Sequence, residues 1–247
     1  MNFISPEVRS QLAPHGVLSA AVYLGNFLLV TGRSPSGEPT GIAPDICREI
    51  ARQLEVELNL IGFETQDEVV DSAATGRCGI VLVGSDPARA KKVTFTPAYV
   101  ELEATYLVMG DSPIQKISQV DQPGVRIASF VKSAYDLWLQ RHLQHATLVH
   151  ADSVQASNAL FVNEKLDALA GLKTGLLTAA QSIPGSRVLD GQFTGIQQAI
   201  ATKTSNLEAI QFLTGCVERF ISTGLVADLI QKYQVQGLAP APLYKHS

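Results

Sequence analysis

The chain has 247 residues, of which 46% are hydrophobic and 17% are charged, and its formal net charge is −4. This composition is typical of a folded globular protein and excludes intrinsic disorder, collagen and coiled coil. Because 19 Lys and Arg residues face 23 Asp and Glu residues, there is no positive surplus to neutralise nucleic-acid phosphates, and we expect no nucleic-acid partner. Cys47, Cys78 and Cys216 lie far apart without a CxxC pair, which predicts buried free thiols rather than disulfides or a zinc site.

Residues 10–32 carry no formally charged side chain and have the length of a membrane span. However, Pro14, Gly16 and Gly25-Asn26 interrupt the apolar residues, which favours a strand, a turn and a second strand over a spanning helix. The first residues also lack the basic start and apolar block of a secretory signal. We therefore expect a chain that does not span a membrane and that is either cytoplasmic or already trimmed of a leader.

The first part of the chain alternates predicted strands and helices. Ile46, Ile50 and Leu54 recur every four residues after Pro44-Asp45, which indicates a helix that begins with a proline and an acidic residue. The predicted elements are a strand at 17–23, a turn-rich loop at 33–39, the helix from 44, a one-faced strand at 56–60, a helix at 65–75, a fully covered strand at 80–83 and a strand at 105–109.

Asp, Ser, Pro and Gly residues near position 110 predict a break in the chain, after which a second series of alternating strands and helices begins. Its predicted elements are strands at 125–129, 147–149, 168–170 and 195–201, helices at 133–142, 153–163, 175–181, 207–221 and 225–233, and an irregular tail from Gly237. Strands that alternate with helices predict mostly parallel sheets covered by helices. Two such series predict two α/β lobes with a small-ligand cleft between them.

Nucleotide-binding motifs are missing, because neither GxGxxG nor GxxxxGK[ST] occurs, and no cofactor is implied. His142, His145 and His150 form a cluster in which the first two are three residues apart on a predicted helix, a spacing that can bind one metal ion. No carboxylate completes that set, so we interpret them as exposed residues near a helix end.

Two short motifs are typical of penicillin-recognising serine enzymes: Ser129 to Lys132 matches SxxK, and residues 173–175 read KTG. That chemistry requires the serine to begin a helix, whereas Ser129 ends a predicted strand. We therefore interpret both motifs as chance matches.

The segment PARAKKVTFTPAY at 87–99, which follows the covered strand, is the most informative. It resembles the signature of the periplasmic solute-binding proteins of ABC importers, in the polar amino-acid-binding family with the type II fold. The residues that match in order and spacing are Arg89, Lys91, Lys92, Phe95 and Tyr99. The segments GEPTGIAPDICREIARQLEVEL, PGVRIASFVKSAYDLWL and KLDALAG agree with the same family, so the resemblance extends from Gly16 to Tyr233.

The resemblance implies a two-lobed α/β fold in which each lobe is a mostly parallel sheet flanked by helices. Lobe 1 would hold residues 1–108 plus 193–247, and lobe 2 would hold residues 109–192. It further implies a monomeric, non-enzymatic protein that captures a small solute by lobe closure, with an ABC permease as a partner and a periplasmic location.

In such proteins an arginine grips the carboxylate of the ligand, and Arg89 occupies that position. A guanidinium matches a carboxylate with two parallel hydrogen bonds, which supplies both charge and orientation. The alternative is a plain surface arginine in an Arg-Lys-Lys face. Ser133, next to Lys132, matches the hydroxyl residue at the start of the first helix of lobe 2, where helix N–H groups meet the same anion. Its alternative role is an ordinary N-cap.

Further contacts are expected from two loops of lobe 1. Tyr23, Asn26 and Phe27 match a loop that supplies an aromatic platform and polar contacts, although residues at the edge of the core need no function. Gly84 and Ser85 follow the covered strand, in a connection about two residues shorter than the family pattern. We expect Ser85 to replace the hydroxyl that this connection normally places on the ligand.

One departure from the family concerns the ligand amine. The family of α-amino-acid binders has an aspartate after KLDALAG, and here that position is Leu172. An unpaired buried ammonium is costly, so the resemblance implies an anionic or carboxylate-bearing ligand that lacks the amine, or one whose amine is met elsewhere. Glu101 and Glu103 are candidates, because alternation puts both on one side of a strand; solvated glutamates are the alternative interpretation.

Two other functions remain open at this point. A buried glutamate with a raised pKa can act as a general acid, and cyclohexadienyl dehydratases resemble this fold and also hold a carboxylate substrate with an arginine. A module that senses a ligand and reports it to a protein partner would use the same site. Binding of a carboxylate for transport is the function that the resemblance favours.

Overall fold

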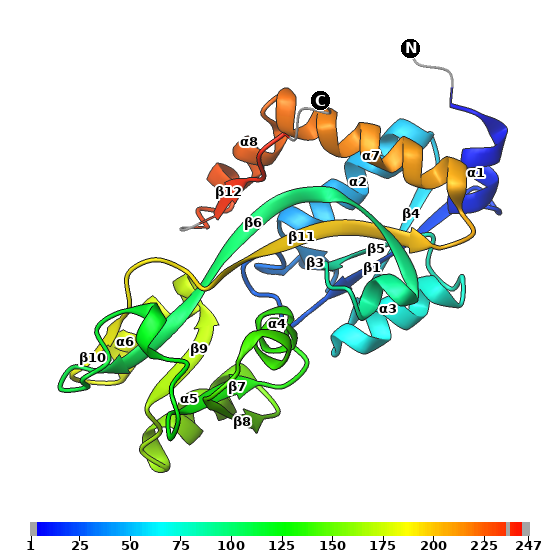
Figure 1. The fold of residues 1–247 in the computed structure, drawn as a ribbon. Coiled ribbons are helices and arrows are strands. Elements are labelled where there is room, and N and C mark those ends of the chain that lie inside the picture. The colour runs from blue at the N-terminus through cyan, green and yellow to red at the C-terminus, as the bar shows by residue number, and fades with distance from the viewer. Residues whose placement is uncertain (1–3, 236–237, 244–247) are drawn as a thin grey trace. The chain divides into compact units, whose positions relative to one another are not determined.

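The computed structural model describes residues 4–235 and 238–243 (Figure 1). The chain divides into two compact units: lobe 1 holds the chain up to Glu101 and again from Gln197, and lobe 2 holds Leu102–Ile196. The chain thus passes from one lobe to the other twice, inside the long strands β6 (Val93–Met109) and β11 (Thr194–Lys203). We expected the divisions a few residues later in β6 and just before β11.

Lobe 1 contains a sheet in which β4, β1 and β5 are parallel neighbours and β11 pairs with β5 in the antiparallel direction. Its strands are β1 (Val17–Tyr23), β2 (Gly32–Arg33), β3 (Pro39–Thr40), β4 (Glu57–Phe63), β5 (Ile80–Gly84) and β12 (Leu238–Pro240). Its helices are α1 (Pro6–Leu12), α2 (Ile42–Leu54), α3 (Gln66–Ala74), the short 3-10 helix η1 (Arg89–Lys91), α7 (Leu207–Ser222) and α8 (Leu225–Lys232).

Both faces of the lobe 1 sheet are covered. On one face α3 packs Val69 and Ala73 against Val81 and Val83 of β5. On the other face lies α2, whose predicted apolar side is confirmed, because Ile46, Ile50 and Leu54 are fully buried. Figure 1 shows α3 on one side of these strands and α2, α7 and α8 on the other. The sheet is therefore a rigid layer that fixes the positions of its strand ends.

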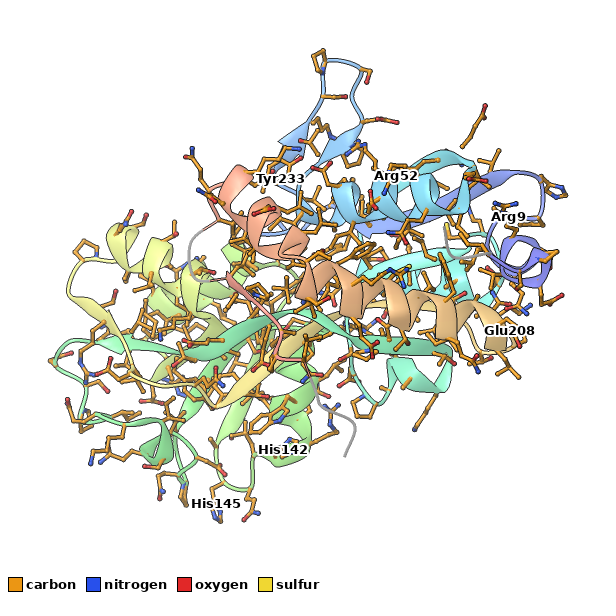
Figure 2. All side chains as sticks on the ribbon, turned by 90° about the horizontal axis from the view of Figure 1, so that it is seen from above. Arg9, Arg52, His142, His145, Glu208 and Tyr233 are labelled. Carbon is orange, nitrogen blue, oxygen red and sulfur yellow. The ribbon has the colours of Figure 1, made fainter. Side chains whose placement is uncertain are left out.

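Asp45 ties α2 to α8. Its carboxylate accepts hydrogen bonds from Lys232 Nζ at 2.7 Å and Tyr233 Oη at 2.8 Å, and from Arg48 Nη1 at 2.8 Å within α2. Figure 2 shows Tyr233 at the end of α8. Burial alone would raise the pKa of Asp45, but these hydrogen bonds outweigh it and lower the pKa.

All three cysteines are buried in lobe 1, which confirms the prediction of buried free thiols. Burial raises the pKa of Cys47 and of Cys78, and raises that of Cys216 to about 12. Because the thiolate is the reactive form of cysteine, burial and the raised pKa both disfavour reaction of these thiols in the folded protein.

Lobe 2 contains parallel strands β8, β7 and β9, with β9 antiparallel to the second half of β6. Its elements are η2 (Ile117–Gln119), β7 (Arg126–Phe130), α4 (Ala134–His142), β8 (Thr147–Ala151), α5 (Val154–Asn163), β9 (Ala168–Leu172), α6 (Lys173–Ser182) and β10 (Ser186–Val188). Leu107, Ala128, Phe161, Leu169 and Leu176 form its core, so α5 and α6 pack onto β6, β7 and β9.

Several elements differ from expectation. The strand expected at 105–109 is longer and begins at Val93. Pro97 does not interrupt it, because Pro97 is exposed within β6, where the missing N–H of a proline is tolerated. Helix α1 was not expected; Ser5 caps it, and Pro6 occupies its first turn. The short hairpin strands β2 and β3 flank the loop expected at 33–39. Strand β12 replaces part of the tail expected to be irregular; Gly237 lies outside the described residues.

Among the residues that the structure describes, the helices fall short of the length and apolar character that a membrane crossing requires.

The Asp45 contacts predict a pH-dependent stabilisation of lobe 1. Because the pKa of Asp45 is lowered in the folded chain, its contribution is complete above the ordinary value of 3.8 and is lost as the pH falls through the lower folded value. We expect Asp45→Asn to lower the free energy of unfolding by about 1–2 kcal/mol at pH 7, and the difference from wild type to vanish in acid, as measured by urea denaturation between pH 2.5 and 7. Glu38→Gln, at an exposed residue 3.4 Å from Arg48, is the control. A difference that does not change with pH would contradict the assignment.

Candidate functional site

The candidate site in lobe 1 lies where two parallel strands end. Tyr23 is the last residue of β1 and Gly84 is the last residue of β5, and β1 and β5 are neighbours in the sheet. In open α/β sheets, ligands bind outside the carboxyl ends of the strands. The segment from Ser85 to η1 leads directly from that edge to Arg89.

Arg89 is the central charge of this cluster and exposes only 5% of its surface, so the interpretation as a plain surface arginine is wrong. Its Nη1 donates to the carbonyl of Gly84 at 2.6 Å, and its Nη2 donates to the side chain of Gln66. Burial lowers the pKa of Arg89, and the carboxylates of Asp86 and Asp67 oppose that shift. The guanidinium is thus held in a fixed orientation in surroundings where charge interactions are strong.

The neighbouring loop residues differ in exposure. Tyr23 is half-buried; burial and the charge of Glu64 raise its pKa, and the positive charge of Arg89 lowers it. Asn26 donates from Nδ2 to Gln198 Oε1 at 3.4 Å, and Phe27 exposes 49% of its surface. The structure therefore brings Tyr23, Asn26 and Arg89 to one edge of the lobe 1 sheet, with Phe27 in the adjoining loop.

Ser85 follows Gly84 directly and is half-buried. Its N–H donates to the carbonyl of Gln197 at 2.8 Å, which fixes the backbone where the connection between β5 and η1 is short. Its role as the replacement hydroxyl stays a prediction.

Two glutamines at this edge were not predicted. Gln66 begins α3 and contacts Arg89, and Gln198 lies in β11 opposite Gly84, with 5% of its surface exposed. Gln198 could have been noticed in the sequence, because it interrupts the apolar run of a strand whose next three residues, Ala199–Ala201, are buried. Gln66 gave no comparable signal, since a polar residue in the first turn of a helix is ordinary.

A second cluster forms at the start of α4 in lobe 2. Ser133 is the N-cap, and its Oγ accepts a hydrogen bond from the N–H of Asp136 at 3.2 Å. Lys132 has a left-handed backbone, with φ of 62°, and its N–H donates to Asp136 Oδ2 at 3.0 Å. Ser133 therefore serves as an N-cap; any contact with a ligand stays a prediction.

Glu103 lies in β6 and pairs with Lys173 Nζ at 2.5 Å, and both side chains are partly exposed. Glu101 is half-buried two residues earlier. Leu172, at the end of β9, precedes α6 as its N-cap residue and supplies no side-chain hydrogen bond. The position that the family fills with an aspartate is therefore apolar here, and Lys173 next to it brings a positive charge to Glu103.

The three histidines lie on different parts of lobe 2: His142 ends α4, His145 follows it, and His150 is in β8. Both His142 and His145 are exposed (Figure 2), and His142 stacks on Trp138 with ring centroids 3.9 Å apart. Across residues 4–235 and 238–243, no three His, Cys, Asp or Glu side chains are grouped so as to hold a metal ion. Ser129 of the SxxK match is buried in β7 and does not begin a helix, and Lys173 of the KTG match is engaged by Glu103.

The family model of the bacterial extracellular solute-binding proteins, family 3, matches residues 27–236. None of the curated proteins matches the chain.

Solved structures share the fold. A binding component of an ABC transporter from Wolinella succinogenes, complexed with lysine, aligns with a TM-score of 0.74 and 17% identity over 88% of this chain and 95% of the other. A mutant of ArgBP from T. maritima aligns with a TM-score of 0.73 and 18% identity over 93% and 100%. An ancestral amino-acid-binding protein, a precursor of cyclohexadienyl dehydratase, aligns with a TM-score of 0.72 and 20% identity over 91% and 98%. At these identities the likeness establishes the fold, and the expected two-lobed α/β class is confirmed.

Tyr99, the last residue of the matched signature, yields a stability prediction. Its side chain is fully buried and its hydroxyl has no hydrogen-bond partner among the described residues. Because a buried unpaired hydroxyl is costly, we expect Tyr99→Phe to raise the free energy of unfolding by about 1 kcal/mol. Urea denaturation measures it, with Tyr233→Phe as the control, since that change removes a hydroxyl bonded to Asp45 and should destabilise. A loss of stability in Tyr99→Phe would show that the hydroxyl is satisfied.

Proposed function

Because the chain belongs to the bacterial extracellular solute-binding proteins of family 3, we propose that it captures a small carboxylate-bearing solute by closure of its two lobes and delivers it to an ABC permease. The solute class is an amino acid or a related organic acid. Binding, rather than a chemical reaction, is the activity that the family supports.

Arg89 is the observation that carries this proposal. A buried guanidinium that is held by a backbone carbonyl and a glutamine at the ends of two parallel strands is suited to a carboxylate, since the planar fork of N–H donors fixes both oxygens. Tyr23, Asn26, Gly84 and Ser85 are the proposed neighbours of the ligand in lobe 1, with Phe27 as the aromatic platform.

Lobe 2 would supply the second set of contacts. The first turn of a helix leaves N–H groups without intrahelical partners, and these favour an anion. Ser133 and Lys132 hold the backbone at the start of α4, and we propose that this turn meets the same carboxylate when the lobes close.

Glu103 is our proposed acceptor for the ligand amine, in place of an aspartate at Leu172. An ammonium group on the ligand would compete with Lys173 for the Glu103 carboxylate. This exchange is feasible because an exposed ion pair contributes only about 0–1 kcal/mol. The structures that share this fold include a complex with lysine and an arginine-bound form of ArgBP from T. maritima. Cationic amino acids therefore belong among the probes, and we do not propose that the ligand is net anionic.

Arg89 yields the main test. We expect thermal shifts and calorimetry to find a carboxylate that binds wild type; at 100 times its dissociation constant it should stabilise by roughly 2.7 kcal/mol. The probes are L-arginine, L-lysine, L-glutamine, L-cysteine, pyruvate and succinate. Arg89→Lys keeps the charge but loses the fork, and we expect binding to weaken about tenfold or more.

Lys91→Ala, in the same 3-10 helix, is the matched control and should bind as wild type does. If Arg89→Lys binds every probe as tightly as wild type, the assignment of Arg89 is wrong. Each probe is also recovered after incubation, because conversion to a product would show an enzyme rather than a binding protein.

The Glu103 assignment is tested by two opposite changes. We expect Glu103→Gln to weaken the binding of amine-bearing probes about tenfold and Lys173→Met to strengthen it, while both leave pyruvate and succinate unaffected. Stability should change by less than about 1 kcal/mol, because the pair is exposed. Equal effects on probes with and without an amine would exclude Glu103, and Glu101→Gln would then be compared in the same assay.

A further inference from the structure

Asp136 is a fully buried carboxylate that the sequence-based site did not include. It lies in the first turn of α4, three residues after Ser133, and its side chain has no exposed surface. One oxygen, Oδ2, accepts both the N–H of Lys132 at 3.0 Å and Nε2 of Gln140 at 2.6 Å. The carboxylate therefore closes the turn before α4 from inside the lobe.

The second oxygen of Asp136 faces a histidine from another element. Oδ1 lies 3.0 Å from Nε2 of His150 in β8, whose side chain is 39% exposed. The contact is short, but Oδ1 receives no well-aligned hydrogen bond from the described residues. His150 thus contacts Asp136 at short distance without a well-aligned hydrogen bond.

The turn that Asp136 holds is strained. Lys132 adopts a left-handed backbone, which a residue with a side chain rarely occupies and which persists only where the surroundings fix it. A buried carboxylate is itself unfavourable unless it is hydrogen-bonded and its charge is balanced. One hydrogen bond lowers both costs, because the Lys132 N–H that donates to Asp136 Oδ2 also fixes the backbone of Lys132.

We propose that Asp136 is a positioning residue of the lobe 2 half-site: it holds the turn from Phe130 to Ser133 in the shape that presents the start of α4 to a carboxylate. This inference rests on the proposed function, in which that turn contacts the ligand.

Hydrogen exchange and fluorescence test the positioning role without any ligand. We expect the Lys132 amide to exchange roughly tenfold or more faster in Asp136→Ala than in wild type, because its acceptor is lost. Trp138, the only tryptophan, lies two residues beyond Asp136 and stacks on His142, so its emission should shift in the same variant.

Asp136→Asn separates geometry from charge. Its single amide oxygen can occupy the place of Oδ2 and accept from both Lys132 and Gln140, so we expect exchange and emission close to wild type. Asp152→Ala removes an exposed acid near β8 and is the matched control. Circular dichroism of each variant shows whether it is folded.

The link to the ligand is measured with the probes of the Arg89 screen that stabilise wild type. Asp136→Ala should weaken them about tenfold, and Asp136→Asn less than about threefold. Unchanged Lys132 exchange in Asp136→Ala, or equal losses in the Ala and Asn variants, would overturn the positioning role. Altered exchange with unaltered affinity would show that the turn is not part of the site. If no carboxylate binds wild type, the proposed function is wrong. The exchange rate of the Lys132 amide would still show whether Asp136 holds the turn before α4.

Discussion

A buried guanidinium constrains the edge of the lobe 1 sheet where β1 and β5 end. Arg89 exposes 5% of its surface, and a cation in that position is stable only when acceptors and negative charge surround it. The carbonyl of Gly84, the side chain of Gln66 and the nearby carboxylates of Asp67 and Asp86 meet that need. These groups come from β5, from the start of α3 and from the connection that follows β5, so one charge fixes the relative positions of three segments of the sheet edge.

Lobe 2 buries a negative charge instead of a positive one, and it also surrounds that charge with polar partners. It buries the carboxylate of Asp136, whose Oδ2 accepts hydrogen bonds from a backbone N–H and from an amide, while Oδ1 lies 3.0 Å from a histidine nitrogen. In both lobes the buried charge lies next to backbone that is proposed to touch the ligand: Gly84 and Ser85 in lobe 1, and Lys132 and Ser133 in lobe 2. Interactions within each lobe thus pre-organise the two proposed half-sites, which would lower the ordering cost of binding a ligand there.

The sequence predicted helices and strands correctly where local signals were strong. The predictions were wrong or incomplete where contacts between distant residues determine the structure. The strand 17–23 is confirmed with both ends, because an apolar run meets Gly25-Asn26. The start of β6 was missed, since Pro97 reads locally as a break. Arg89 was predicted as a ligand contact because its segment resembles the family signature, whereas Gln66 becomes its partner only through the packing of α3 beside β5. Asp136 had a local signal, an acid three residues after a capping serine, but its burial and its contact with His150 of β8 depend on the fold.

The placement of the cysteines and the tryptophan gives each lobe its own natural reporter. All three thiols are buried in lobe 1, and the single indole is in lobe 2. A thiol reagent can reach a buried cysteine only after lobe 1 unfolds locally or globally. The rate of modification therefore reports the unfolding of lobe 1 and not that of lobe 2. Indole emission follows the other lobe. The order in which the two lobes unfold in denaturant can therefore be measured on the natural chain, without an introduced label.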